Sequence, residues 1–92
     1  MSSNDRVPVE TADVWPEDAQ DEEALVINWF VNEGSEIEQG DLLCEIQIEK
    51  VEIEIPAPAS GSIAEIVSGE DAEIERGDTL AYISSTSVTI EP

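Results

Sequence analysis

The sequence predicts an all-β fold, a flattened barrel or sandwich of two four-stranded antiparallel sheets with an internal pseudo-twofold repeat. Apolar residues alternate with carboxylates between Leu25 and Ile90, most clearly in "EIQIEKVEIEIP". A period of two places one face of a strand in a core and the other in water. No segment of ten or more residues has the period of a helix. The chain also aligns with itself when Gly40 is placed on Gly77.

Individual strands follow from this alternation. Residues 1–12 lack periodicity and are predicted to form an N-terminal tail, and residues 85–92 a C-terminal tail that ends in a short strand, "SVTI". Val14–Pro16 is a predicted edge strand, because proline suits an edge. Glu17–Glu23 is an acidic connection. Further strands are expected at Ala24–Val31, near Ile37, and at Leu42–Ile48, Val51–Ile55, Ser62–Val67, Glu73–Glu75 and Thr79–Ile83.

The repeat explains how so short a chain can build a core. It aligns "NEGSEIEQGDLLCEI" with "GEDAEIERGDTLAYI", and it also places Val14 on Val51. Two four-strand units, each too small to bury its own apolar face, would pack about a pseudo-twofold axis. Each unit has a Gly-Asp pair, Gly40-Asp41 and Gly77-Asp78, where glycine would permit a turn with positive φ.

One position departs from strict alternation. Leu43 and Ile46 both have apolar counterparts in the repeat, but they are three residues apart. Two such residues cannot share one face of a regular strand. We therefore predict a bulge or bend between them.

Charge excludes several classes of function. The 92 residues include 23 acidic and 3 basic side chains and no histidine, for a formal net charge of −20. Three cations release few counterions from nucleic acid, and an anionic membrane surface repels such a chain, so we expect neither partner. The length allows one small domain.

The scarce residue types narrow the chemistry further. Histidine, the commonest metal ligand, is missing, and one cysteine cannot build a disulfide or a cysteine-rich metal site. The acidic clusters lack the spacing of a calcium loop, so we expect a solvated face and no metal site. No apolar run reaches the roughly 18 residues of a membrane span, and no signal-peptide core is present. We expect a soluble, cytoplasmic protein.

A hairpin around Lys50 is the most informative part of the chain. With Glu49 and Lys50 as a two-residue turn, Ile48 faces Val51 and every further cross-strand pair is polar with polar or apolar with apolar. A shift of one residue would destroy this matching, so the register is well specified. These further pairs are Gln47 with Glu52, Ile46 with Ile53, Glu45 with Glu54, and Cys44 with Ile55.

Lys50 is the only lysine, and this register places it at the tip of the hairpin. The simplest interpretation is an ordinary surface lysine. A lysine used for covalent attachment accounts better for one lysine kept at one apex, since an amine on a flexible stem suits amide formation with a carboxylic-acid cofactor. An activating enzyme would have to supply the chemistry.

The residues around Lys50 carry a resemblance. "CEIQIEKVEIEIPAPASGSIAEI" followed by "ERGDTLAYI" closely resembles the biotinyl/lipoyl attachment domain, over about Val14 to Ile83. Gly40 lies ten residues before Lys50 and Gly61 eleven after it, which is similar to the family spacing. The resemblance implies a barrel-sandwich hybrid fold and a carrier domain over residues 13–84.

Residues beside the lysine favour one branch of this family. Biotin carriers usually flank the acceptor lysine with methionines, whereas lipoyl domains usually have an acid before it and a small or apolar residue after it. Glu49-Lys50-Val51 is similar to the lipoyl pattern. Gln47 and Ala24 depart from it, because an acid and a glycine are common there. The resemblance implies lipoate on Lys50, or biotin as the alternative, with Gln47, Glu49 and Val51 in recognition.

A function follows from the lipoyl resemblance. It implies a non-catalytic, free-standing swinging-arm carrier that shuttles acyl groups and reducing equivalents within a 2-oxoacid dehydrogenase-type system. The implied partners are a lipoate- or biotin-attaching enzyme, a thiamin-dependent decarboxylase, an acyltransferase and dihydrolipoyl dehydrogenase. As an isolated domain it would be a monomer. The cofactor carries the chemistry, and tethering raises its effective concentration at successive sites.

Other interpretations remain open at this point. The chain could be a biotin carrier of a carboxylase, an unmodified adaptor of the same fold that binds partner proteins, or an acidic decoy that mimics nucleic acid. Cys44, Trp29 and Trp15 are best explained by packing. The acidity suggests salt adaptation, a halophilic source, because about molar salt shortens the screening length to roughly 3 Å.

Overall fold

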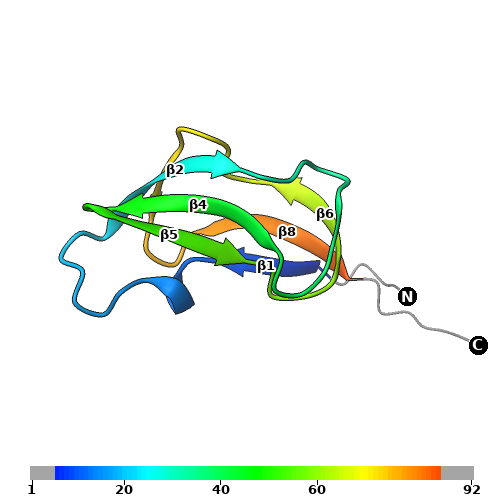
Figure 1. The fold of residues 1–92 in the computed structure, drawn as a ribbon, viewed down its shortest axis with the longest axis horizontal. Helices are drawn as coiled ribbons and strands as arrows, with labels where there is room; N and C mark the ends of the chain where they lie inside the picture. The colour runs from blue at the N-terminus through cyan, green and yellow to red at the C-terminus, as the bar shows by residue number, and fades with distance from the viewer. Residues whose placement is uncertain (1–5, 86–92) are drawn as a thin grey trace, which may run out of the picture.

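Two four-stranded antiparallel sheets form the molecule, as predicted (Figure 1). The computed structural model describes residues 6–85. Their one helical element is a single 3-10 turn, η1 (Ala12–Val14). The predicted fold class is confirmed, and the shared strands agree with their predicted limits to within two residues. The strands are β1 (Arg6–Glu10), β2 (Glu23–Trp29), β3 (Glu36–Ile37), β4 (Leu42–Ile48), β5 (Val51–Pro56), β6 (Gly61–Ile66), β7 (Glu73–Glu75) and β8 (Thr79–Ser85).

The strand orders of the two sheets reveal the repeat in three dimensions. One sheet has the order β1-β8-β6-β3 and the other β5-β4-β2-β7. The alignment that places Gly40 on Gly77 also places β4, β2 and β7 on β8, β6 and β3, and the remaining strands, β5 and β1, then correspond. The predicted pseudo-twofold relation is confirmed, and each half contributes an outer strand, a long central pair and a short strand.

Bulges occur at equivalent places in the two halves. Leu43 is the extra residue where β4 pairs with β5, and Leu80, its counterpart, is the extra residue where β8 pairs with β1. A second matched shift lies at Ile27 of β2 and Ala64 of β6. The expected irregularity is therefore real, but it lies at Leu43 itself and not after it. A bulge of one residue turns both Leu43 and the adjacent Cys44 into the core.

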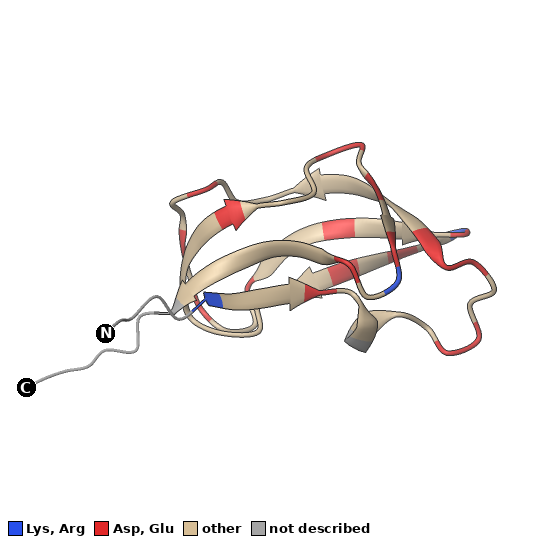
Figure 2. Ribbon diagram, turned by 180° about the vertical axis from the view of Figure 1, so that it is seen from behind, with Lys and Arg blue, Asp and Glu red and all other residues tan. Residues whose placement is uncertain are grey.

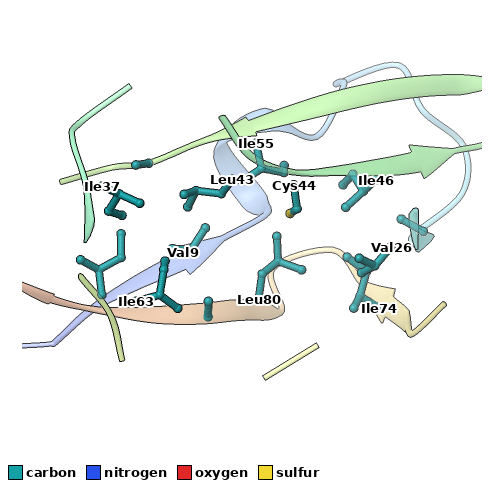
Figure 3. Close-up of a cluster of buried hydrophobic side chains, with 14 of the residues drawn as sticks. Val9, Val26, Ile37, Leu43, Cys44, Ile46, Ile55, Ile63, Ile74 and Leu80 are labelled. Atoms are coloured by element: carbon teal, nitrogen blue, oxygen red, sulfur yellow. The ribbon is translucent and has the colours of Figure 1, made fainter. Parts of the chain in front are cut away.

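The core lies between the sheets and draws on both halves about equally (Figure 3). Leu43 and Leu80 are completely buried, as are Ile46 and Ile83. Burial of apolar side chains from every strand is the main term that stabilises so acidic a chain. The ten labelled side chains in the close-up are Val9, Val26, Ile37, Leu43, Cys44, Ile46, Ile55, Ile63, Ile74 and Leu80.

The Gly-Asp turns have the predicted backbone. Gly40 has φ +94° and Gly77 has φ +90°. Each following aspartate accepts a hydrogen bond from a backbone N–H three residues earlier, Asp41 from Glu38 and Asp78 from Glu75, both at 2.8 Å. The repeat thus preserves the turn chemistry as well as the strands.

The predicted N-terminal tail is wrong where the structure describes it. Arg6–Glu10 is not tail but strand β1, which pairs with β8 and buries Val9. Pro8 is tolerated because β1 is an edge strand, where a missing N–H removes no central ladder bond. The β-structure therefore begins before the expected domain boundary at residue 13. At the other end Ser85 completes β8, and the strand predicted in "SVTI" lies outside the described residues.

The edge strand expected at Val14–Pro16 is also absent. Val14 ends the 3-10 turn η1, and Trp15 is buried with its indole N–H donating to the carbonyl of Asp21 at 3.1 Å. The indole hydrogen bond closes a loop between Trp15 and Asp21, and this segment pairs with no strand of either sheet. The predicted match of Val14 with Val51 is also wrong, because the structural counterpart of β5 is β1.

Candidate functional site

The β4–β5 hairpin has the predicted register. Ile48 pairs with Val51, and the four further pairs from Gln47–Glu52 to Cys44–Ile55 also match. Glu49 and Lys50 form the two-residue turn between the strands. In Figure 1 this turn points away from the end of the barrel where β1 begins and β8 ends. The only lysine of the chain thus lies in an exposed turn at one end of the β-structure.

The backbone of the turn is unusual at Glu49. Its φ is +58°, in the left-handed region that glycine, asparagine and aspartate enter more readily than glutamate does. The side-chain amide of Gln47 donates to the carbonyl oxygen of Glu49 at 3.3 Å. Ile48, just before the turn, is buried and fixes the hairpin to the core.

The four residues singled out from the sequence lie together at this tip. Lys50 and Glu49 are exposed, Gln47 is half-buried on β4, and Val51 opens β5 with about half of its surface (52%) exposed. Val51 thus leaves an exposed apolar surface at the residue that follows Lys50. The hairpin thus presents an exposed amine on a segment that also carries an exposed valine and several acids.

A contact between Glu49 and a distant loop was not predicted. One carboxylate oxygen of Glu49, Oε2, accepts the backbone N–H of Gln20 at 2.6 Å and that of Asp21 at 2.9 Å. The partners lie 29 and 28 residues earlier, and alternation along one strand carries no information about such a contact. The loop from Trp15 to Glu22 thus contacts the turn of the hairpin through Glu49.

An open groove of about 410 Å³ runs beside the hairpin. Its lining joins the turn to the outer face of the sheet, where Leu25 sits beside Gln47 and Glu73. Leu25 is 40% exposed, so the groove offers apolar surface as well as carboxylates. It is lined by Asp21, Glu23, Ala24, Leu25, Gln47, Glu49 and Glu73.

Charges near the site are almost all negative (Figure 2). Across residues 6–85, two ion pairs form, Arg6 with Glu65 at 3.2 Å and Arg76 with Glu22 at 3.7 Å. Lys50 takes part in neither pair, so its amine is engaged by no carboxylate in this part of the chain. The Lys50 side chain can therefore reach outward into solvent.

The remaining candidate residues serve the core. Cys44 is completely buried, and burial, with a smaller effect of the Glu45 charge, raises the pKa of its thiol from 9.0 to about 12. Such a thiol is inert, as expected from its predicted packing role. The indole N–H of Trp29 donates to the carbonyl of Ser68 at 2.7 Å while its ring packs against the core.

No group of three or more potential ligand side chains is placed to hold a metal ion within residues 6–85. In the same described residues, no helix has the length and apolarity needed to cross a bilayer. The turn that holds Lys50 is thus the feature with the clearest chemical use in the described structure.

Comparison with known proteins decides the family. A family model for biotin and lipoyl attachment, described as "Biotin-requiring enzyme", matches residues 15–83. The chain belongs to the biotin/lipoyl attachment family. The resemblance inferred from the Lys50 hairpin, the repeat and the glycine spacing is confirmed.

Curated relatives of this attachment domain include acetyltransferases. Dihydrolipoyllysine-residue acetyltransferase components of the pyruvate dehydrogenase complex from Staphylococcus aureus and Staphylococcus epidermidis are 36% and 35% identical to it over 63 residues. These matches cover 68% of this chain, but only 15% and 14% of the relatives. The chain thus spans about a seventh of the length of the relatives it matches.

Solved structures share the attachment-domain fold. The lipoyl domain of the 2-oxoglutarate dehydrogenase complex from Azotobacter vinelandii superposes with a TM-score of 0.68 and 28% identity, over 86% of this chain and 98% of that domain. A single-chain, multidomain long-chain acyl-CoA carboxylase gives a TM-score of 0.71 at 14% identity, over 90% of this chain and 7% of that one. The second likeness shows the fold alone.

Proposed function

We propose that Lys50 carries a lipoyl group in amide linkage and that the protein acts as a non-catalytic swinging-arm carrier. The observation that carries this proposal is the position of the only lysine, which is exposed in the two-residue turn at the tip of the β4–β5 hairpin. The chain belongs to a family of cofactor-attachment domains. An isolated tip is accessible to an attaching enzyme and then to other active sites. A monomeric domain suffices for this role.

The residues present fit a covalently attached carboxylic acid. The Lys50 amine is exposed and is engaged in no ion pair across residues 6–85. Its nitrogen attacks the activated carboxyl carbon, the C–N bond forms, the bond to the leaving group breaks, and the amine loses a proton. Gln47, Glu49 and Val51 lie on the same hairpin as Lys50 and would form part of the surface that the attaching enzyme meets.

When attached, the dithiolane of the lipoyl group would accept an acyl group and reducing equivalents from a thiamin-dependent decarboxylase, pass the acyl group on at an acyltransferase, and be reoxidised by dihydrolipoyl dehydrogenase. The protein provides the tether, which raises the local concentration of the arm at each site. Its net charge of −20 would steer encounters with basic rims on these cytoplasmic partners.

Lipoate is favoured over biotin by two observations. Glu49 and Val51 flank the lysine in the manner of lipoyl domains, and no methionine stands beside it. The curated relatives are dihydrolipoyllysine-residue acetyltransferase components, and the solved structure with the higher identity of the two is a lipoyl domain. A biotin carrier of a carboxylase is the second candidate, because the same family model covers both cofactors.

The proposal is tested by modification in vitro. Purified protein is incubated with lipoate, ATP and a lipoate-attaching enzyme, or with biotin, ATP and a biotin-attaching enzyme, and its intact mass is measured. We expect one lipoyl adduct, and none on the Lys50→Arg variant. Because Lys50 is exposed, this variant should keep its free energy of unfolding within about 0.5 kcal/mol. A biotin adduct, or no adduct on folded wild-type protein, would contradict the proposal.

A further inference from the structure

Glu49, the acid before Lys50, makes its hydrogen bonds with a loop and not with the Lys50 amine. The Oε2 atom of Glu49 accepts two backbone N–H groups, from Gln20 at 2.6 Å and from Asp21 at 2.9 Å. Both hydrogen bonds have a charged carboxylate as acceptor, and such charge-assisted bonds are shorter and stronger than neutral ones. A carboxylate held in this way is turned toward the loop, and it forms no ion pair with Lys50 in the described chain.

The loop that supplies these donors is itself fixed to the body of the barrel. Trp15 is only 4% exposed, and its indole N–H donates to the carbonyl of Asp21 at 3.1 Å. Asp21 therefore bonds the buried indole through its carbonyl and Glu49 through its N–H. This chain of contacts links the core to the hairpin turn through one side chain of the turn.

The hairpin needs such a link because its tip is exposed and its turn is conformationally unfavourable. Glu49 has φ +58°, and the amide of Gln47 holds its carbonyl at 3.3 Å. The Gln47 bond fixes the turn within the hairpin, while the Glu49 carboxylate fixes it to the rest of the molecule. Loss of the carboxylate would leave Lys50 on a turn free to move with the end of β4 and β5.

We propose that Glu49 is a positioning residue that latches the Trp15–Glu22 loop to the hairpin and so sets where Lys50 stands. This inference rests on the proposed function, since it concerns presentation of Lys50 to the attaching enzyme. The latch does not touch the amine. Its loss should therefore raise the KM of the attaching enzyme for this carrier and leave kcat unchanged.

Four variants separate positioning from other roles. Glu49→Ala removes the acceptor, and Glu49→Gln keeps an oxygen at the same reach without the charge. Glu52→Gln is the matched control, because Glu52 is an exposed acid of the same hairpin with no hydrogen bond to the loop. Gln20→Pro removes one donor while Glu49 stays intact. Because proline has no amide hydrogen, exchange is followed at Asp21 in this variant, and it should accelerate while KM rises, as in Glu49→Ala.

Two measurements are made on each variant that is folded by circular dichroism. Amide hydrogen exchange at Gln20 and Asp21 reports the latch in the unmodified protein. Steady-state lipoylation, followed by intact mass, reports KM and kcat. For Glu49→Ala we expect exchange at Gln20 and Asp21 to accelerate about tenfold and KM to rise about tenfold. Glu49→Gln should recover part of both changes, and Glu52→Gln should match the wild type.

Each other outcome overturns the inference at a definite step. Unchanged exchange in Glu49→Ala would show that no latch exists. Faster exchange with unchanged KM would show a latch without a positioning role. If Glu49→Gln keeps slow exchange but modifies as poorly as Glu49→Ala, the enzyme reads the carboxylate directly. If wild-type protein takes no lipoate, the proposed function fails. The exchange data would still show whether the latch exists, because they do not depend on modification.

Discussion

The two halves of the barrel are built alike, but they end differently. Both have the same strand order, the same two bulges and the same Gly-Asp turns. Even a long-range acceptor is repeated, since Glu70 accepts the N–H of Trp29 and its counterpart Glu33 accepts that of Ile66. The outer pair β4–β5 is closed by Glu49-Lys50, whereas β8 and β1 are not joined. The repeat therefore provides the scaffold, and the site lies where the symmetry is broken.

The largest expected effect comes from a position that differs between the halves. Gly61 of β6 corresponds to Ala24 of β2, so Gly61→Ala would make the halves more alike. A Cβ at Gly61 would lie 2.1 Å from the carbonyl oxygen of Ser84, and its φ is +153°. Overpacking against backbone together with this φ should cost about 3 kcal/mol, measured as the free energy of unfolding in urea.

Gly69→Ala is the control for this substitution. A Cβ there meets no atom within 4 Å, and Gly69 has no positive φ. Its free energy of unfolding should stay within about 0.5 kcal/mol of the wild type. Equal stability of Gly61→Ala and Gly69→Ala would show that the close approach of β6 to β8 is not a real constraint.

A second asymmetric pair predicts a pH dependence. Cys44 corresponds to Ala81, and both are completely buried. Burial raises the pKa of the Cys44 thiol from 9.0 to about 12, so the unfolded chain loses this proton first as the pH rises. The thiol contributes stability that is complete below pH 9.0 and is lost up to about pH 12.

Cys44→Ala should remove this contribution. Between pH 9 and about pH 11 the wild type should lose roughly 2 kcal/mol more than the variant, by chemical denaturation at each pH. The variant also makes the two halves identical at this position. Parallel pH profiles for the two proteins would contradict the assignment of a buried, protonated thiol.

A smaller effect is expected on the outer face of the lysine-bearing sheet. Glu45 and Glu54 are directly paired across β4 and β5, while their counterparts Tyr82 and Pro8 are uncharged. Like charges opposite one another destabilise a sheet, so Glu54→Gln should add about 0.5 kcal/mol in dilute buffer. The gain should vanish in molar salt, where screening is short-ranged. Glu17→Gln, in the loop, changes the net charge equally and should have a smaller effect.

The salt dependence of wild-type stability tests whether the acidity of the whole chain is an adaptation to high salt. With a net charge of −20, wild-type stability should rise from dilute buffer to molar salt as self-repulsion is screened. Cooperative unfolding with unchanged stability over this range would remove the support for a halophilic origin. The acidity would then need another cause, such as docking to basic partners.

The sequence was most informative where contacts are local. The β4–β5 register followed from pairing around Lys50, because a two-residue turn leaves no freedom once polar and apolar residues must match. Strand β1 was missed because its partner β8 lies about 70 residues or more away and Pro8 interrupts its short alternation. The Glu49 contact was missed for the same reason, since only the fold brings Gln20 and Asp21 to the turn.

The central claim is that Lys50 is the attachment site of the carrier. The most direct test is the intact mass and peptide map of the protein isolated from its native host. The account predicts a single lipoyl adduct, located on the peptide that contains Lys50, with no other site modified. Folded native protein with an unmodified Lys50, or with biotin there, would contradict it.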